Sequence, residues 1–92
     1  MQPPQLFANG DIVDDQFSIY DAADVGRAVR TLRRRRGWSQ SDLAEWLGVH
    51  RVTVSKLERG GTVDLPLVIR ALSVLGARVT IDVRATSAGP NG

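Results

Sequence analysis

The spacing of apolar positions divides most of the chain into four short helices. Between residues 20 and 76, apolar side chains recur three and four positions apart, which is the period of a helix with one buried face. Glycines interrupt this pattern at positions 37, 48, 60 and 76, and a glycine commonly ends a helix. The pattern therefore predicts helices over residues 21–36, 39–47, 51–59 and 64–75.

Polar residues mark where these helices begin. Asp21 and Ser39 are typical N-cap residues, and each is followed three positions later by an aspartate. Asp64 is expected to cap the last helix, with a proline tolerated in its first turn. The expected inward-facing residues are Val25, Ala28, Val29 and Leu32; Leu43, Ala44, Trp46 and Leu47; Val54 and Leu57; and Leu65, Val68, Ile69, Leu72 and Leu75.

The period changes to two after the last helix. Residues 77–84 alternate apolar and polar side chains, which predicts a half-buried β-strand. A lone strand leaves its backbone groups unpaired, and no second strand follows it. We therefore expect the strands of two copies to pair antiparallel in a homodimer, so that an apolar row covers the helices; the alternative is pairing within the chain, with residues 17–20. The row consists of Val79, Ile81 and Val83.

The two ends of the chain show no sustained period. The sequence therefore divides into an N-terminal arm (1–19), one domain (20–84) and a disordered tail (85–92). A length of 92 residues allows a single domain. No apolar run approaches the ~20 residues of a membrane span, and the first residues lack the features of a signal peptide, so we expect a cytoplasmic protein.

Composition narrows the possible chemistry. The chain has no cysteine and one histidine, His50, so it offers neither a thiolate nucleophile nor a histidine cluster for a metal. It also lacks a glycine-rich phosphate loop followed by lysine. Asp14 and Asp15 are more simply read as an exposed loop than as a pair of catalytic acids. We expect no enzyme activity and no cofactor.

Charge is concentrated in the centre of the chain. The first 20 residues carry a net charge of −3, whereas residues 21–59 carry +4 from nine bases and five acids. Nearly all of the bases are arginines, which suit two-point contact with phosphate or guanine. This distribution favours a nucleic-acid partner, although a solvated basic face would have the same composition.

The second and third predicted helices form the strongest functional signal. They meet through Gly48-Val49-His50, a link so short that it favours the sharp crossing of a helix-turn-helix. The sequence here resembles the Cro/C1 helix-turn-helix family, and residues 20–84 are similar to its HipB-type antitoxin repressors. The matching residues are Arg33, Gly37-Trp38-Ser39-Gln40, Leu43-Ala44, Gly48-Val49, Thr53-Val54-Ser55, Leu57-Glu58 and Gly60.

The resemblance implies a mainly α, lambda-repressor-like domain of four to five helices with a C-terminal strand that pairs across a dimer. It implies that the third predicted helix enters the major groove of DNA. It also implies that Arg33 forms a structural pair with Glu58, which we favour over a DNA contact by Arg33. Arg34, Arg35 and Arg36 are expected to be a solvated cap or weak phosphate contacts.

The side chains on the third predicted helix fit base recognition. Arg51 can grip guanine at two points, Val52 offers an apolar surface to a thymine methyl, and Ser55 and Lys56 can reach base edges. His50 is a poor N-cap, and either a phosphate contact or a tolerated turn residue would explain it. Trp38 and Trp46 are expected to pack in or around the core. The expected phosphate contacts are Ser39, Gln40, His50, Thr53 and Arg59.

Three functions remain open from the sequence. The leading hypothesis is a dimeric repressor that binds a palindromic operator in double-stranded DNA. The resemblance implies that it is an antitoxin, partnered with a HipA-like kinase toxin and controlling its own operon. The alternatives are a free-standing phage-type regulator and an interaction module that neutralises a partner without binding DNA. No membrane partner is expected.

Overall fold

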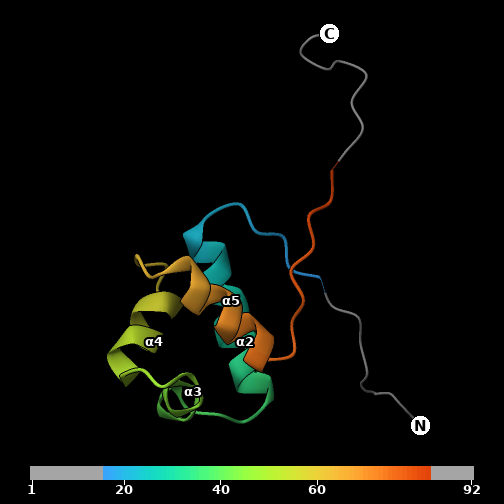
Figure 1. The fold of residues 1–92 in the computed structure, drawn as a ribbon. Helices are drawn as coiled ribbons and strands as arrows, with labels where there is room; N and C mark the ends of the chain where they lie inside the picture. The colour runs from blue at the N-terminus through green and yellow to red at the C-terminus, as the bar shows by residue number, and fades with distance from the viewer. Residues whose placement is uncertain (1–15, 84–92) are drawn as a thin grey trace, which may run out of the picture.

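Four helices follow one another in the computed structural model, which describes residues 16–83. They are α2 (Ala22–Arg35), α3 (Gln40–Leu47), α4 (Arg51–Glu58) and α5 (Leu65–Val74) (Figure 1). α4 packs against both α2 and α3, and α5 packs against α3. The prediction of four helices in this region is confirmed, with each end within a residue of the expected position.

Reciprocal hydrogen bonds fix the start of α2 and α3. The Asp21 carboxylate accepts from the backbone N–H of Asp24 at 2.9 Å, and the Asp24 carboxylate accepts from the backbone N–H of Asp21 at 3.3 Å. Ser39 and Asp42 repeat this arrangement at distances of 3.0 and 2.8 Å. Each capping box satisfies donors that the first helical turn leaves unpaired. Asp64 occupies the N-cap of α5, but its side chain makes no capping hydrogen bond.

The turn between α3 and α4 depends on Gly48. Its φ of 70° and ψ of 32° lie in the left-handed region, which side chains with a Cβ rarely adopt. Apart from Gly48 itself and its two chain neighbours, no residue has an atom within 4 Å of the position that a Cβ would occupy. The backbone conformation alone therefore requires glycine at this position.

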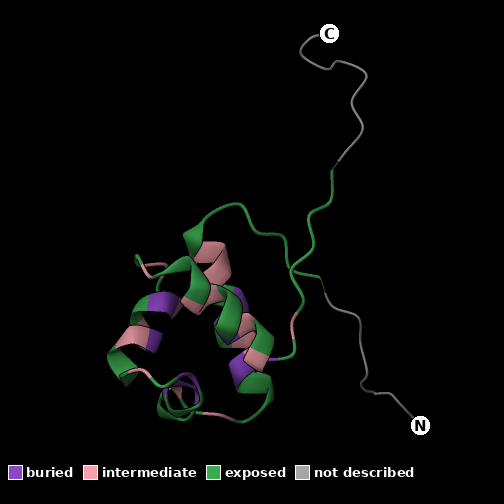
Figure 2. Cartoon of the chain, viewed as in Figure 1, coloured by how far each residue is buried: buried purple, intermediate pink, exposed green. Residues whose placement is uncertain are grey.

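All four helices contribute to one aliphatic core. Each helix carries buried residues as well as exposed ones along its ribbon (Figure 2). The four helices thus hold one another through a shared interior rather than through separate pairs. The buried core residues are Val29, Leu43, Ala44, Leu47, Val54, Leu57, Ala71 and Leu75.

The predicted inward face of α5 is partly wrong. Leu65 and Ile69 are 69% and 45% exposed, whereas Ala71 is fully buried. The helix is turned so that Ala71 and Leu75 lie in the core, where the small alanine side chain permits close packing. A pattern of large apolar residues does not reveal a contact that is centred on alanine.

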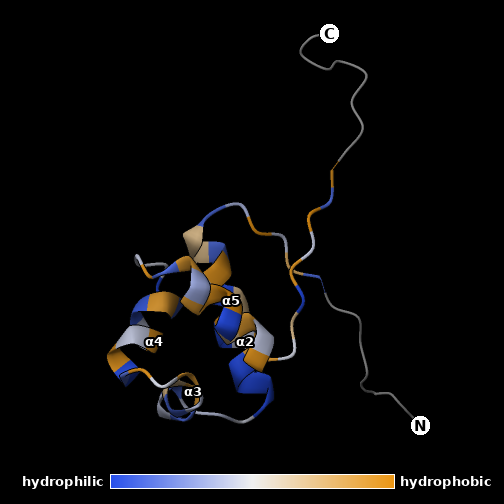
Figure 3. Ribbon diagram, viewed as in Figure 1, coloured by the Kyte–Doolittle hydropathy of each residue, from blue (hydrophilic) through white to orange (hydrophobic). Residues whose placement is uncertain are grey.

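The segment after α5 leaves the helical domain. Residues 77–83 form neither helix nor strand in the described chain (Figure 1). No backbone hydrogen bond joins them to residues 17–20, so the alternative of pairing within the chain is not found in this structure. Their alternating hydropathy remains visible in Figure 3, and Val79, Ile81 and Val83 are all exposed. A β-strand needs a partner for its backbone groups, and the described residues of a single chain supply none.

The remaining parts of the predicted arm, strand and tail, residues 1–15 and 84–92, lie outside the described residues. No helix between residues 16 and 83 is long and apolar enough to cross a membrane.

Candidate nucleic-acid interface

α4 combines a buried side with a side open to solvent. Val54 and Leu57 are 1% and 2% exposed and anchor the helix in the core. Arg51, Val52 and Lys56 are exposed, and the exposed fraction of Val52 is 63%. An apolar side chain and two cations therefore lie on the exposed side of a helix whose opposite side is packed in the core.

A glycine lets the backbone of α2 touch the end of α4. A Cβ at Gly26 would lie 2.5 Å from the carbonyl oxygen of Glu58 and 2.6 Å from that of Leu57, which is too close for any side chain. The two helices thus meet without an intervening side chain. Sequence reasoning missed this contact, although an isolated glycine inside a helical pattern is the signal for it.

An ion pair between α2 and α4 lies beside this contact. The Arg33 guanidinium donates to both carboxylate oxygens of Glu58, from Nε at 2.6 Å and from Nη2 at 3.0 Å. The two side chains are 9% and 4% exposed. Arg33 also donates from Nη1 to the carbonyl oxygen of Trp38 at 2.7 Å. The arginine therefore ties α4 to α2 and to the residue that precedes the N-cap of α3.

The surroundings keep both members of the pair charged. Burial by itself raises the pKa of Glu58, but hydrogen bonds from Arg33 and Gln40, together with the charges of Arg33 and Arg30, outweigh it and place that pKa below its ordinary value. The hydrogen bond to Glu58 raises the pKa of Arg33 further against the effect of burial. The pair is ionised at neutral pH.

Gln40 connects the buried pair to the exposed start of α4. Its Nε2 donates to Oε1 of Glu58 at 3.0 Å, and its Oε1 accepts from Nη1 of Arg51 at 3.3 Å. Because one amide serves both neighbours, Glu58 fixes which end of Gln40 faces Arg51. The structure thus brings four of the predicted site residues into one connected set: Arg33, Glu58, Gln40 and Arg51.

The other predicted phosphate residues differ in their surroundings. Ser39 uses its hydroxyl as the α3 cap, and the N-cap residue His50 is exposed and makes no side-chain capping hydrogen bond. Thr53 is partly buried. Arg59 donates from Nη1 to the hydroxyl of Ser55 at 2.5 Å, so these two residues also lie together. Of the predicted base-contacting residues, Ser55 is the least exposed.

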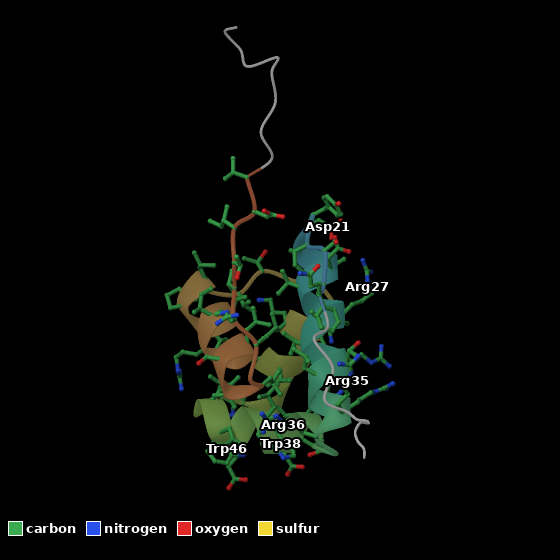
Figure 4. The ribbon with its side chains drawn as sticks, turned by 90° about the vertical axis from the view of Figure 1, so that its right-hand side faces the viewer. Asp21, Arg27, Arg35, Arg36, Trp38 and Trp46 are labelled. Carbon is green, nitrogen blue, oxygen red and sulfur yellow. The ribbon has the colours of Figure 1, made fainter. Side chains whose placement is uncertain are left out.

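Two tryptophans stack at the outer side of α3. The rings of Trp38 and Trp46 are 5.7 Å apart between centroids and 14° from parallel. The Arg36 guanidinium lies 5.2 Å from the centroid of Trp38 on a cation–π contact. Figure 4 shows Trp38 and Trp46 together at the α3 end of the molecule. Trp38 packs against the core while Trp46 is 63% exposed, so Trp46 lies at the rim rather than among the inward residues of α3.

Among residues 16–83, no group of three or more histidine, cysteine, aspartate or glutamate side chains is placed to hold a metal ion.

The comparison with known families rests on the same region. A helix-turn-helix domain family matches residues 24–85, about two thirds of the chain. The chain belongs to this family. The helix-turn-helix domain is 40% identical over 50 residues to the competence pilus inhibition repressor of Acinetobacter baylyi, a match covering 54% of this chain and 46% of the relative. It is 35% identical over 40 residues to antitoxin HipB of Escherichia coli, covering 44% and 46%.

A solved structure extends the similarity beyond these segments. In a structure described as the HipA–HipB–O2–O3 complex, one chain matches the helix-turn-helix domain with a TM-score of 0.65 and 26% identity, covering 74% of this chain and 97% of that one. The predicted resemblance to Cro/C1-type and HipB-type proteins is confirmed. The helix-turn-helix domain spans about half the length of the curated relatives that it matches.

Proposed function

We propose that this helix-turn-helix domain binds double-stranded DNA in a sequence-specific manner, with α4 in the major groove. One observation carries the proposal: α4 is locked to α2 by Gly26 and the Arg33–Glu58 pair, and its free side presents Arg51 and Lys56. A recognition helix must be rigidly placed, because base-edge contacts depend on orientation as well as on distance. The hydrogen bond from Arg51 to Gln40 orients the guanidinium before DNA arrives.

In this proposal the exposed side of α4 reads bases. Arg51 contacts a guanine, Val52 a thymine methyl group, and Ser55 and Lys56 neighbouring base edges. The phosphate contacts flank these residues and set the register of the helix in the groove. They come from Ser39, Gln40, His50, Thr53 and Arg59.

The domain acts as a homodimer in this proposal. Val79, Ile81 and Val83 are 57%, 84% and 82% exposed in the single chain, and an alternating segment with unpaired backbone groups is suited to β-pairing with a second copy. Antiparallel pairing about a two-fold axis would place two copies of α4 about one DNA turn apart, ~34 Å. That geometry calls for a palindromic operator. In this division of the chain, residues 20–84 form the dimeric domain, between an arm (1–19) and a tail (85–92).

A further part of the proposal concerns regulation. The similarity to HipB and to a chain in the HipA–HipB–O2–O3 complex supports an antitoxin that represses its own operon and binds a HipA-like kinase in the cytoplasm. The similarity to the competence pilus inhibition repressor supports the second candidate, a repressor without a toxin partner. Neither role involves catalysis by this chain.

DNA selection from a random library by the full chain tests the core of the proposal. Wild-type protein is expected to enrich a palindrome, and Arg51→Ala is expected to reduce the preference for that sequence over random DNA by about 10- to 100-fold, the worth of one bidentate guanine contact. Arg27→Ala serves as the control, because Arg27 lies on α2 and pairs with Asp24. An unchanged preference after Arg51→Ala would refute the placement of α4 in the major groove. The absence of any enriched sequence would refute sequence-specific binding.

Two further measurements test the assembly. A chain ending at residue 77 is expected to sediment as a monomer at concentrations where the full chain is a dimer. A tight dimer of the shortened chain would exclude a role for the strand in dimer formation.

To test for a toxin partner, the neighbouring reading frame of the operon is co-expressed with this chain. Co-purification of the two proteins, together with growth arrest when the neighbour is expressed alone, supports the antitoxin function. If neither is observed, the second candidate function, a repressor without a toxin partner, is favoured.

A further inference from the structure

The C-terminal half of α2 carries more positive charge than the described residues neutralise. Residues 30–36 include five arginines. Arg33 is paired with Glu58, and Arg35 and Arg36 lie against the rings of Phe17 and Trp38. Two arginines remain, at positions 30 and 34, and neither guanidinium forms a hydrogen bond or ion pair with any residue between 16 and 83.

These two arginines share one side of α2, next to the proposed interface. They are four positions apart and therefore neighbours on the helix surface. Arg30 is close enough to α4 for its charge to act on Glu58. Arg34 follows Arg33, which reaches the carbonyl oxygen of Trp38 just before α3. The side of α2 that carries Arg30 and Arg34 therefore adjoins, through Arg30, the connected set that runs from Arg33 through Gln40 to Arg51.

We infer that Arg30 and Arg34 form a second DNA contact, which holds backbone phosphates beside the groove that α4 enters. The inference rests on the proposed DNA binding and adds a surface to it. Guanidinium groups bind phosphate with two parallel hydrogen bonds, and long exposed side chains can follow a backbone without reading its sequence. The contact therefore contributes affinity for any duplex and no preference between sequences.

Stabilisation of α2 by itself does not account for both arginines. Cations are favourable in the last turn of a helix, which includes Arg34, but Arg30 lies before that turn. Like charges four positions apart repel each other and weaken a helix. A phosphate backbone removes this repulsion, which links the unpaired charges to a polyanion rather than to folding.

Arg27 provides a matched control on the same helix. Its guanidinium pairs with the Asp24 carboxylate, so its charge is already neutralised within the chain. Figure 4 shows Arg27 projecting from the outer side of α2. Replacing Arg27 by glutamine removes one positive charge, as does the same change at Arg30 or Arg34, so the three variants separate the loss of an unpaired arginine from a general loss of net charge.

The salt dependence of binding to a random-sequence 30-base-pair duplex, measured by fluorescence anisotropy on the full chain, tests the inference. Each phosphate contact contributes about 0.9 to the slope of log Kobs against log salt. Arg30→Gln and Arg34→Gln are each expected to reduce the slope by about 0.9 per protomer, while Arg27→Gln leaves it unchanged. Arg30→Lys and Arg34→Lys keep the charge and are expected to restore most of it.

Four results would contradict the inference or the proposed function on which it rests. An unchanged slope in both glutamine variants overturns it, as does an equal decrease for Arg27→Gln, which would be a general effect of net charge. Preference for the selected palindrome is measured in the same variants and is expected to stay at the wild-type level; a loss of preference would make these arginines base readers and also overturn the inference. A wild-type protein that binds no duplex would instead refute the proposed function itself.

Discussion

Removal of Arg33 is expected to destabilise the domain more than removal of any exposed arginine. Arg33→Ala leaves the Glu58 carboxylate, 4% exposed, with one remaining hydrogen bond from a described side chain, that of Gln40. Breaking a buried pair by removing one partner costs ~3–5 kcal/mol, because the other charge stays buried without compensation. A domain of this size has a total stability of ~5–15 kcal/mol, so much of it would be lost.

The measurement is thermal unfolding followed by circular dichroism at a fixed protein concentration. A loss of 1 kcal/mol lowers the melting midpoint of a small domain by ~4–8 °C, so Arg33→Ala is expected to lower it by about 12–40 °C. Arg27→Ala is the control: Arg27 also pairs with a carboxylate, but 68% of its side chain is exposed, so its loss is expected to be far smaller. Fixed concentration matters because self-association of the proposed kind would add to apparent stability.

A double variant separates the cost of an orphaned charge from the value of the pair. Arg33→Met combined with Glu58→Leu removes both charges and keeps apolar volume, so it is expected to be more stable than either single variant. If Arg33→Ala melted no lower than Arg27→Ala, or if the double variant lost the sum of both single changes, the description of a buried and coupled pair would be wrong.

Three other predictions concern different contacts in the domain. Gly26→Ala is expected to destabilise by ~1–3 kcal/mol, because its Cβ would meet the carbonyl oxygens of Leu57 and Glu58; stability equal to or above wild type in urea unfolding would contradict this contact. Glu58 has a lowered pKa, so its contribution is fully present above the pKa of the unfolded chain and is lost as pH falls through the folded value; Glu58→Gln should therefore flatten the acid side of the stability curve, and an unchanged curve would count against it. Trp38→Ala should lower the melting midpoint more than Trp46→Ala, since only Trp38 packs on the core, and equal decreases would place both rings at the rim.

The helices were predictable because their signals are local. The capping residues Asp21 and Ser39 and the left-handed Gly48 act through bonds or dihedral angles within a few residues, which sequence spacing records directly. The orientation of α5 was not predictable in the same way, because Ala71 takes the central position through its small size. The small size of an alanine favours close packing only where another helix faces it, and the sequence does not record which helix that is.

The contacts of the candidate site also depend on residues that are far apart in the sequence. Arg33 and Glu58 are 25 positions apart, and no local pattern joins them; their pairing was expected only from the family resemblance, and the structure brings them together. The link from Gln40 to both Glu58 and Arg51 went unnoticed, because it requires the crossing angle of α3 and α4. The strand expected over residues 77–84 is not formed by residues 77–83, because alternation of apolar and polar side chains does not by itself supply a partner for the backbone groups.

The stacked indoles make the protein its own optical probe. Trp38 and Trp46 are the two tryptophans of the chain, so its indole emission arises from one end of α3 and from the loop before it. Two near-parallel aromatic chromophores in van der Waals proximity also couple their electronic transitions, which gives circular dichroism a signal sensitive to their mutual angle. Because Trp38 is joined to Arg33 through its carbonyl oxygen, a shift of α3 against α2 would change that angle. Binding events near α3 can therefore be followed without attaching a dye.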